Sequence, residues 1–264
     1  MRLFAQRFAI KEETRVLDLG GGAFNWTLLE VRPRLTILDI YEHSNKAEWA
    51  DYVVGDGCHT SFGDRSFDIV FSNSVIEHVG RKERQQAFAR ECMRCGHAFF
   101  VQTPNKWFPV DTHTLMPFAH WLPQRFFRKL IRFSPRFLFF KPDPGDLEDF
   151  SNMRLLTRKD LQEFFPEAEI LEEKVCGITK SLIAVSPAKG PFEGAPARRD
   201  GTPIGGAVRL PLIPKEHRRT YKGTKGTRNR ALDSGPAEKN TKYVMIRSES
   251  PINCRFVCAS RKSP

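Results

Sequence analysis

An acid followed by three glycines, with a second acid about twenty positions later, is the pattern in this chain that points most directly to chemistry. Residues 15–22 read Arg-Val-Leu-Asp-Leu-Gly-Gly-Gly, and a second apolar run, residues 35–40, contains Asp39. Glycines let backbone approach a ligand closely, and an acid at the end of the next strand accepts hydrogen bonds from ribose hydroxyls. The spacing predicts a nucleotide-type cofactor site on an α/β sheet.

The elements that must position these residues alternate between strands and helices. Strands are predicted at residues 15–19, 35–40, 52–54, 67–72, 98–102, 168–175 and 181–185, and helices at residues 24–31, 81–95 and 157–165, the last opened by a capping pair of Thr157 and Asp160. Alternation implies parallel pairing, whereas the last two strands are joined by too few residues for a crossover helix. We therefore expect an α/β fold: a Rossmann-like, seven-stranded, mostly parallel sheet with an antiparallel terminal hairpin and helices on both faces.

Charge and aromatic content divide the chain near residue 185. Residues 1–185 contain 25 Lys and Arg against 25 Asp and Glu, whereas residues 186–264 contain 17 against 6 and hold only two of the 22 Phe. A segment so poor in aromatic mass buries too little surface to offset its ordering entropy. The sequence predicts one domain over residues 1–185 and a basic, Gly- and Pro-rich, disordered tail over residues 186–264.

The lack of a recognisable targeting signal and the scattered cysteines favour a cytoplasmic protein. No early segment resembles a secretory signal, and no apolar run reaches the length of a membrane span. The six cysteines are scattered, which argues against a disulfide framework. Cys92 and Cys95 form a CxxC, but no second pair stands at zinc-site spacing, so we expect no metal.

Four stretches together resemble the class I S-adenosylmethionine-dependent methyltransferases, and most closely the methyltransferase type 11 group. They are Val-Leu-Asp-Leu-Gly-Gly-Gly (16–22), Thr-Ile-Leu-Asp-Ile (36–40), Val-Val-Gly-Asp-Gly (53–57) and Ser-Phe-Asp-Ile-Val-Phe-Ser-Asn-Ser-Val-Ile-Glu-His-Val (66–79). The resemblance covers about residues 15–185 and implies S-adenosyl-L-methionine as the cofactor.

The resemblance also implies which residues hold that cofactor. Asp18, Gly20 and Gly22 would line its methionine end, and Asp39, followed by Ile40, would accept both ribose hydroxyls. Asp56, followed by Gly57, would face the adenine, and Asn73 would stand at the mouth of the fourth strand.

Two departures keep other interpretations open. The family pattern DxGxGxG has a third glycine where this chain has Phe24, and only fourteen residues precede Arg15. A non-catalytic module with a degenerate cofactor site is therefore an alternative. A nicotinamide dinucleotide is another, although its GxGxxG fingerprint fails at Asn25.

The acceptor side is expected in a lid insertion over about residues 103–152, because ligands of parallel sheets sit beyond the carboxyl ends of the strands. Its aromatic residues could form an apolar pocket or plain core. His113 and His120 are candidate bases, with Asp111 nearby, and Glu77 and His78 are candidates behind the fourth strand. Methyl transfer from a sulfonium needs alignment and exclusion of water more than a catalytic triad.

Basic segments suggest partners. Six basic residues and no acid interleave with Phe and Leu between positions 125 and 141: Arg125, Arg128, Lys129, Arg132, Arg136 and Lys141. This pattern is typical of contact with an anionic membrane, of a phosphate-bearing substrate, or of a solvated helix face.

The tail offers an RNA-associated alternative, and no obligate protein partner is evident. Asn73-Ser74-Val75-Ile76 lacks the Asn/Asp-Pro-Pro-aromatic turn of base-amine methyltransferases, so a small-molecule or lipid-linked acceptor is favoured.

Overall fold

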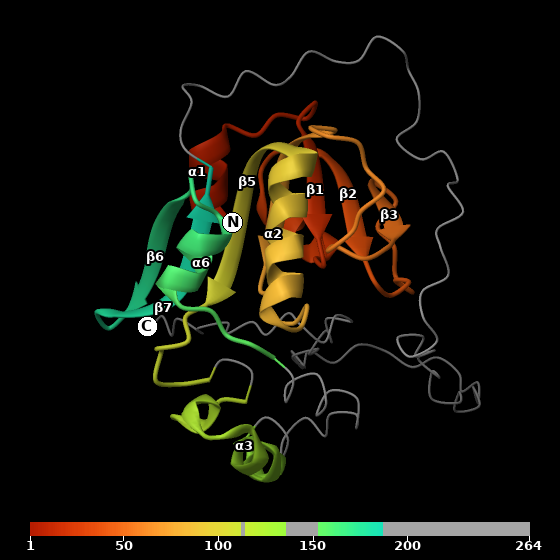
Figure 1. Cartoon of the computed structure of the whole chain (residues 1–264). Helices are drawn as coiled ribbons and strands as arrows, with labels where there is room; N and C mark the ends of the chain where they lie inside the picture. The colour runs from red at the N-terminus through yellow and green to blue at the C-terminus, as the bar shows by residue number, and fades with distance from the viewer. Residues whose placement is uncertain (112–113, 136–152, 187–264) are drawn as a thin grey trace, which may run out of the picture. The chain divides into compact units, whose positions relative to one another are not determined.

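The computed structural model describes residues 1–111, 114–135 and 153–186 (Figure 1). The helical elements are α1 (Arg2–Phe8), η1 (Ala23–Leu28), α2 (Lys82–Cys95), η2 (Ala119–Trp121), α3 (Gln124–Leu130), η3 (Ile131–Phe133) and α6 (Arg158–Phe164); the strands are β1 (Arg15–Leu19), β2 (Arg34–Asp39), β3 (Ala50–Val54), β4 (Phe67–Asn73), β5 (Gly96–Pro104), β6 (Glu169–Val175) and β7 (Ile178–Val185). The predicted tail lies outside the described residues from position 187 onward, so its disorder and the domain boundary stay predictions.

The seven strands form one sheet in the order β3-β2-β1-β4-β5-β7-β6. Strands β1 to β5 pair in parallel, and β7 pairs antiparallel with both β5 and β6. The β6–β7 turn consists of Cys176 and Gly177, both at positive φ. The predicted mostly parallel sheet with a terminal hairpin is confirmed. β5 runs further at both ends than the predicted 98–102, and β7 begins at Ile178 rather than at residue 181.

Two apolar clusters place helices on both faces of the sheet, as the sequence predicts. On one face, Leu17 and Val70 of the sheet pack in one cluster with Phe88 of α2 and with α6. On the other, Phe4 of α1 packs in a second cluster with Trp26 of η1 and with β4. In Figure 1, α2 and α6 accordingly lie in front of the sheet and α1 lies behind it.

The capping pair of α6 is confirmed in detail. The Asp160 N–H donates to Thr157 Oγ1 over 3.1 Å, and the Thr157 N–H donates to Asp160 Oδ2 over 2.9 Å. Both orphan donors at the start of the helix are therefore satisfied by two side chains three positions apart.

The helix predicted over residues 24–31 is wrong in type and length, since the chain forms only the short 3-10 helix η1. Trp26 is fully buried against the sheet, and Leu29 already has extended backbone. Pro33 also disfavours helical backbone just before β2. The sequence-based prediction missed α1, whose Phe4 and Phe8 face the second cluster.

We expect Phe4→Ala to lower the free energy of unfolding by about 3–5 kcal/mol, because the Phe4 ring is fully buried and its removal leaves a cavity. Four aromatic rings surround it, those of Phe8, Trp26, Phe71 and Phe100, at centroid distances of 5.1–5.6 Å. Urea denaturation measures the loss, with Leu3→Ala of the same helix, 43% exposed, as the matched control. Equal stability of the two variants would contradict a core role for α1.

Candidate cofactor and acceptor site

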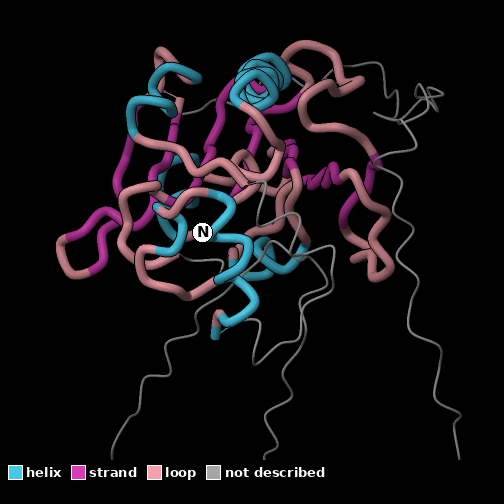
Figure 2. Tube along the Cα trace, turned by 60° about the horizontal axis from the view of Figure 1, so that its bottom comes forward, coloured by secondary structure: helices cyan, strands magenta, loops and turns pink. Residues whose placement is uncertain are grey.

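The predicted cofactor residues lie at the carboxyl ends of β1 to β4, the lower edge of the sheet in Figure 1. Figure 2 turns this edge forward and shows the loops that leave the strands there. Backbone hydrogen bonds hold the ends in register: the Gly20 N–H donates to Leu38 O over 2.7 Å, and the Gly55 N–H donates to Asp39 O over 2.8 Å. Since β1 has β2 on one side and β4 on the other, the strand order reverses at this point, where ligands of open α/β sheets bind.

The three glycines after β1 have different roles. Gly20 has φ +70°, and a Cβ there would lie 2.6 Å from Val75 Cγ1. A Cβ on Gly21 would lie 2.1 Å from both carboxylate oxygens of Asp18. A Cβ on Gly22 would meet nothing within 4 Å. Packing therefore requires the first two glycines, whereas Gly22 borders open space where a ligand can approach the backbone.

Asp18 is a fully buried carboxylate beneath this turn. Trp26 Nε1 donates to Asp18 Oδ2 over 2.8 Å, and among the described residues no donor reaches Oδ1. Burial raises the pKa of Asp18 to about 7; the Trp26 hydrogen bond opposes this rise, and the nearby Asp39 adds to it. A buried oxygen without a donor is costly, so Oδ1 suits a donor that a ligand brings.

Asp39 ends β2 with partners on both oxygens. Its Oδ1 accepts the Tyr41 N–H over 3.0 Å, and its Oδ2 contacts His43 Nε2 over 3.2 Å. The His43 ring lies 5.2 Å from the Tyr52 ring, measured between centroids, and so contacts β3. Each carboxylate oxygen has two lone pairs, so both can still accept hydrogen bonds from hydroxyls. The neighbouring Ile40 is exposed.

Asp56 and Gly57 follow β3 and contact α2. Asp56 Oδ1 accepts the Cys58 N–H over 2.9 Å, and its Oδ2 forms an ion pair with Arg84 over 3.0 Å. Burial opposes ionisation of Asp56, but the bonds from Cys58 and Arg84 outweigh it and lower the pKa. A Cβ on Gly57 would lie 2.9 Å from the Phe88 ring, so glycine lets this loop lie close to α2.

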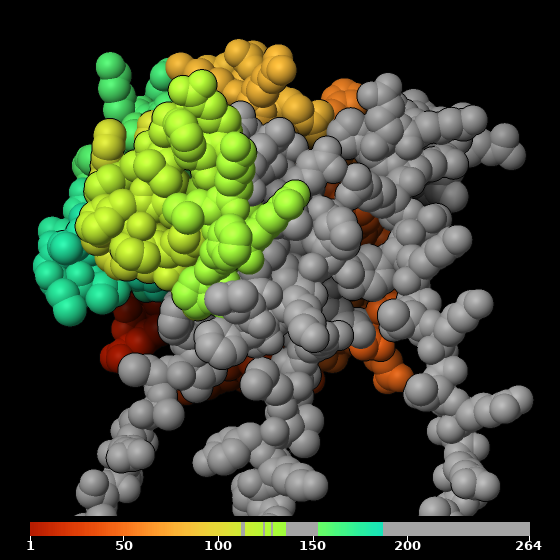
Figure 3. All heavy atoms as spheres, turned by 90° about the horizontal axis from the view of Figure 1, so that it is seen from below, coloured from red at the N-terminus to blue at the C-terminus, as the bar shows by residue number. Residues whose placement is uncertain are grey.

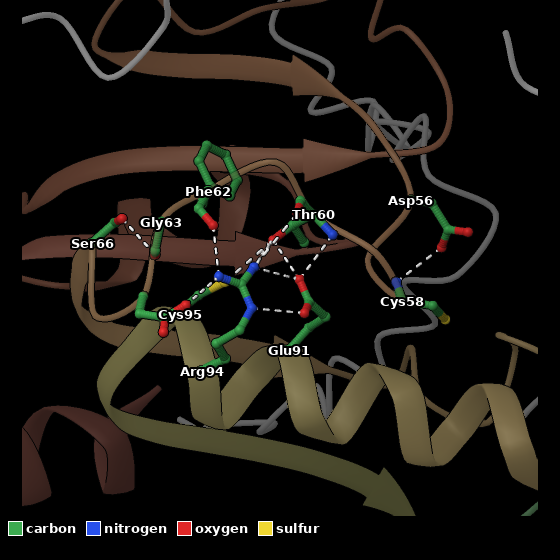
Figure 4. A network of polar contacts seen from close by, with 10 residues as sticks. Asp56, Cys58, Thr60, Phe62, Gly63, Ser66, Glu91, Arg94 and Cys95 are labelled. Carbon is green, nitrogen blue, oxygen red and sulfur yellow. Dashed lines mark hydrogen bonds and ion pairs between the residues drawn. The ribbon is translucent and has the colours of Figure 1, made fainter. Parts of the chain in front are cut away.

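A polar network on α2 holds the rest of that loop (Figure 4). Glu91 accepts two hydrogen bonds from Thr60, over 2.8 Å from the backbone and 2.6 Å from the hydroxyl. Arg94 donates to Glu91 over 2.8 Å and to Phe62 O over 2.7 Å. Burial disfavours the charged form of Glu91, but these donors prevail and lower its pKa to about 2. The loop that carries Asp56 is thus fixed by α2.

The end of β4 and the segment after it hold three predicted site residues. Asn73 ends the strand, and its Oδ1 accepts a bond from the Ser74 hydroxyl over 3.2 Å. Glu77 is fully buried: its Oε2 accepts from Thr103 Oγ1 over 2.9 Å, and its backbone oxygen accepts from the Arg154 N–H over 2.9 Å. Glu77 therefore links this segment to the end of β5 and to the approach to α6. His78 is half-buried in the same turn.

Within the lid, the structure describes His120 but not His113, which lies outside the described residues. His120 Nε2 lies 3.0 Å from Lys106 O. A carbonyl only accepts, so Nε2 carries the proton and Nδ1 is the basic nitrogen of the neutral ring. Nδ1 is buried and has no partner among the described residues. His120 lines a narrow recess together with Phe108 and Asp111.

The predicted aromatic residues of the lid lie mostly on its surface. Trp121 lies 6.2 Å from Trp107 and 5.1 Å from Phe118, measured between ring centroids, and all three rings are exposed. They form an aromatic cluster rather than a core.

The residues predicted to hold the cofactor therefore lie together at one edge of the sheet. The prediction did not include two residues whose side chains form hydrogen bonds with them, Trp26 and Arg84. For the first, the available signal was a Trp eight positions after Asp18, whereas nothing local pairs Arg84 with Asp56. The CxxC cysteines, Cys92 and Cys95, are both buried in the core on the α2 side.

Comparisons with known proteins agree with the motifs. Residues 17–98 match the family model described as methyltransferase domain. This match confirms the resemblance to a methyltransferase domain over residues 17–98. No curated protein compared with the chain matches it.

Solved structures that are similar to the chain have low identity. A SAM-dependent methyltransferase from Methanosarcina mazei shares 15% identity, with a TM-score of 0.45 over 70% of this chain and 95% of that chain. A protein from Pyrococcus horikoshii shares 15%, with a TM-score of 0.47 over 70% and 86%. A SAM-dependent methyltransferase from Anabaena variabilis shares 17%, with a TM-score of 0.42 over 70% and 82%.

Asp18 predicts a pH dependence of cofactor binding. Because the pKa of the buried carboxyl is about 7, protonation below that pH removes the charge that would attract a cationic amino group of the predicted cofactor. Affinity for S-adenosylhomocysteine, measured by calorimetry, should fall as the pH drops through this range. Asp18→Asn should bind more weakly and lose this dependence. Trp26→Phe removes a bond that favours the ionised form, so it should shift the midpoint upward. A parent affinity that is constant from pH 8 to about 5 would contradict this role.

Proposed function

We propose that the chain transfers a methyl group from S-adenosyl-L-methionine to a small-molecule or lipid-linked acceptor by in-line displacement. The observation that carries the proposal is the fully buried Asp18, whose Oδ1 has no donor among the described residues, beside the open space at Gly22. These residues fit the cationic methionine end of that cofactor. When bound, the cofactor supplies a methyl group already activated on a sulfonium.

The chain's own residues then have to bind, orient and exclude water. Asp18 and the backbone at Gly22 would hold the methionine end. Asp39 would accept the ribose hydroxyls, with His43 and Tyr41 holding its carboxylate in place. The loop with Asp56 and Gly57, anchored on α2, would border the adenine.

The acceptor would lie toward the lid, where the chain leaves β5 at the same edge of the sheet. His120 would take a proton at Nδ1 if the acceptor must lose one, since Lys106 O orients the ring. Trp107 would close the approach with its exposed ring. We place the activity in the cytoplasm, because Cys58, Cys92, Cys95 and Cys176 are free thiols, as a reducing compartment would keep them.

A non-catalytic binding module is the second candidate. Phe24 stands in place of the third glycine, and both Asp39 and Asp56 already have partners within the chain. An RNA-associated methyltransferase would use the basic tail, which lies outside the described residues. Calorimetry with S-adenosylmethionine, followed by transfer of its labelled methyl group to lipid extracts, separates these functions. Binding without transfer to any acceptor would favour the module.

We expect Asp39→Ala to weaken S-adenosylhomocysteine binding at least about tenfold, because charge-assisted hydrogen bonds contribute about 1.5–3 kcal/mol each. Asp51→Ala is the matched control: it removes the same charge from an exposed position on the neighbouring strand β3. Calorimetry measures both variants, and circular dichroism verifies their folding. Unchanged affinity in Asp39→Ala would place the ribose elsewhere.

His120→Ala should leave cofactor affinity within a few-fold of the parent but lower the rate of methyl transfer about 10²-fold or more, because general bases typically contribute 10²–10⁴-fold. The acid limb of the pH–rate profile should flatten in this variant, since the proposed general base is gone. Trp107→Ala is the companion: it should lower the rate without changing the shape of the profile. An acid limb that persists in His120→Ala would move the base to another residue, with His113 and His78 as the next candidates.

A further inference from the structure

The lid exposes a stripe of large apolar side chains along one side of α3 and η3. Phe126, Leu130 and Phe133 follow at positions i, i+4 and i+7, which lie on one face of a helix. All three are exposed, Phe126 by 50% and Phe133 by 71%. Figure 3 shows the lid residues, in yellow to light green, gathered at one side of the face seen from below.

A basic stripe runs beside the apolar one. Arg125, Lys129 and Arg132 also follow at i, i+4 and i+7, and their side chains are exposed. The Arg125 guanidinium lies 4.9 Å from the centre of the Phe126 ring. Residues 114–135 contain no Asp or Glu, so no acidic side chain within this segment offsets the positive charge.

A different side of the same helices, next to the apolar stripe, anchors them. Phe127 and Ile131 are buried and pack with Ala119 in a small cluster of their own. The exposed stripe is therefore not the face that folds the lid. It adds to the exposed aromatic cluster of Trp107, Phe118 and Trp121. Among the described lid residues, eight large apolar side chains are therefore exposed to solvent: these three with Val110, Leu122, Phe126, Leu130 and Phe133.

The chemistry of this surface indicates its occupant. A groove for an apolar peptide would not need a basic border, and a solvated helix face would not carry Phe126, Leu130 and Phe133 in register. Nucleic acid would be contacted by the basic stripe, but stacked bases do not require an aliphatic and aromatic row along a helix. Apolar and aromatic side chains flanked by Lys and Arg are the pattern by which a helix lies in the interface of an anionic bilayer.

We propose that the lid surface formed by Phe126, Leu130 and Phe133, with Arg125, Lys129 and Arg132, docks on an anionic membrane surface. The apolar stripe would enter the boundary between headgroups and acyl chains, and the basic stripe would contact the headgroup charges. Within residues 1–111, 114–135 and 153–186, no helix has the length and apolar character needed to cross a bilayer. The proposal deepens the proposed function, since a docked lid would meet a lipid-linked acceptor, but it rests on lid residues and not on the cofactor site.

Flotation of the full chain with vesicles tests the proposal. Vesicles of equal parts phosphatidylcholine and phosphatidylglycerol should bind the parent, and vesicles of phosphatidylcholine alone should bind it weakly. Phe126→Ser with Phe133→Ser should weaken binding at least about tenfold, because the apolar contribution scales with buried apolar area. Arg125→Gln with Arg132→Gln should weaken it about 30-fold at low salt, at about 1 kcal/mol per charge.

Leu3→Ser with Val175→Ser is the matched control, because it removes two exposed apolar side chains outside the lid and should bind like the parent. All variants keep the basic tail, so lid variants that float like the parent would assign binding to the tail and overturn the proposal. The proposal would also be overturned if the parent did not bind the anionic vesicles. The same holds if the arginine variant floated with the vesicles like the parent but was no longer retained on RNA. Calorimetry with S-adenosylhomocysteine on the same preparations shows separately whether the proposed function fails.

Discussion

The enclosure of the Asp18 carboxylate is the constraint on which the rest of the site depends. A buried acid at the end of β1 is costly unless donors reach it. The indole of Trp26 provides one donor, and Gly21 must lack a side chain because its Cβ would collide with both oxygens. Trp26 in turn packs edge-on against Phe4 and Phe71. One residue therefore belongs both to the core behind the sheet and to the cofactor edge.

This arrangement also explains how the turn accepts Phe24 where the family pattern has glycine. In η1 the chain enters a 3-10 helix from extended backbone at Gly22, and the Phe24 side chain projects into solvent with 56% exposure. A third glycine serves close packing of a helix on its strand. Here Trp26, two positions later, makes that contact, so Phe24 needs no room beneath the turn.

Local patterns were enough to predict the strands, α2 and the cap of α6, because each depends on residues close in sequence. They failed where contacts between residues distant in sequence determine the local structure. A helix as short as α1 is not stable alone and forms because Phe4 and Phe8 pack on the sheet. Helical periodicity suggested a helix over residues 24–31, but the burial of Trp26 selects a tighter turn. For the site, motif spacing placed the acids, whereas the bonds of Asp56 to Arg84 and of Glu77 to Thr103 join residues more than 25 positions apart.

The two halves of the site are supported in different ways. The cofactor edge is held by the sheet and by α2, whose Glu91 and Arg94 bind the loop after β3. Among the described residues of the lid, the buried apolar side chains form one small cluster around Phe127. The lid is attached at its start by backbone bonds such as Lys106 N–H to Leu156 O, 2.9 Å long. Segments with few buried contacts open at low free-energy cost. Docking of the lid on a membrane surface would therefore order the acceptor side of the site without changing the cofactor side. The choice of acceptor and the affinity for the cofactor would then depend on different parts of the chain.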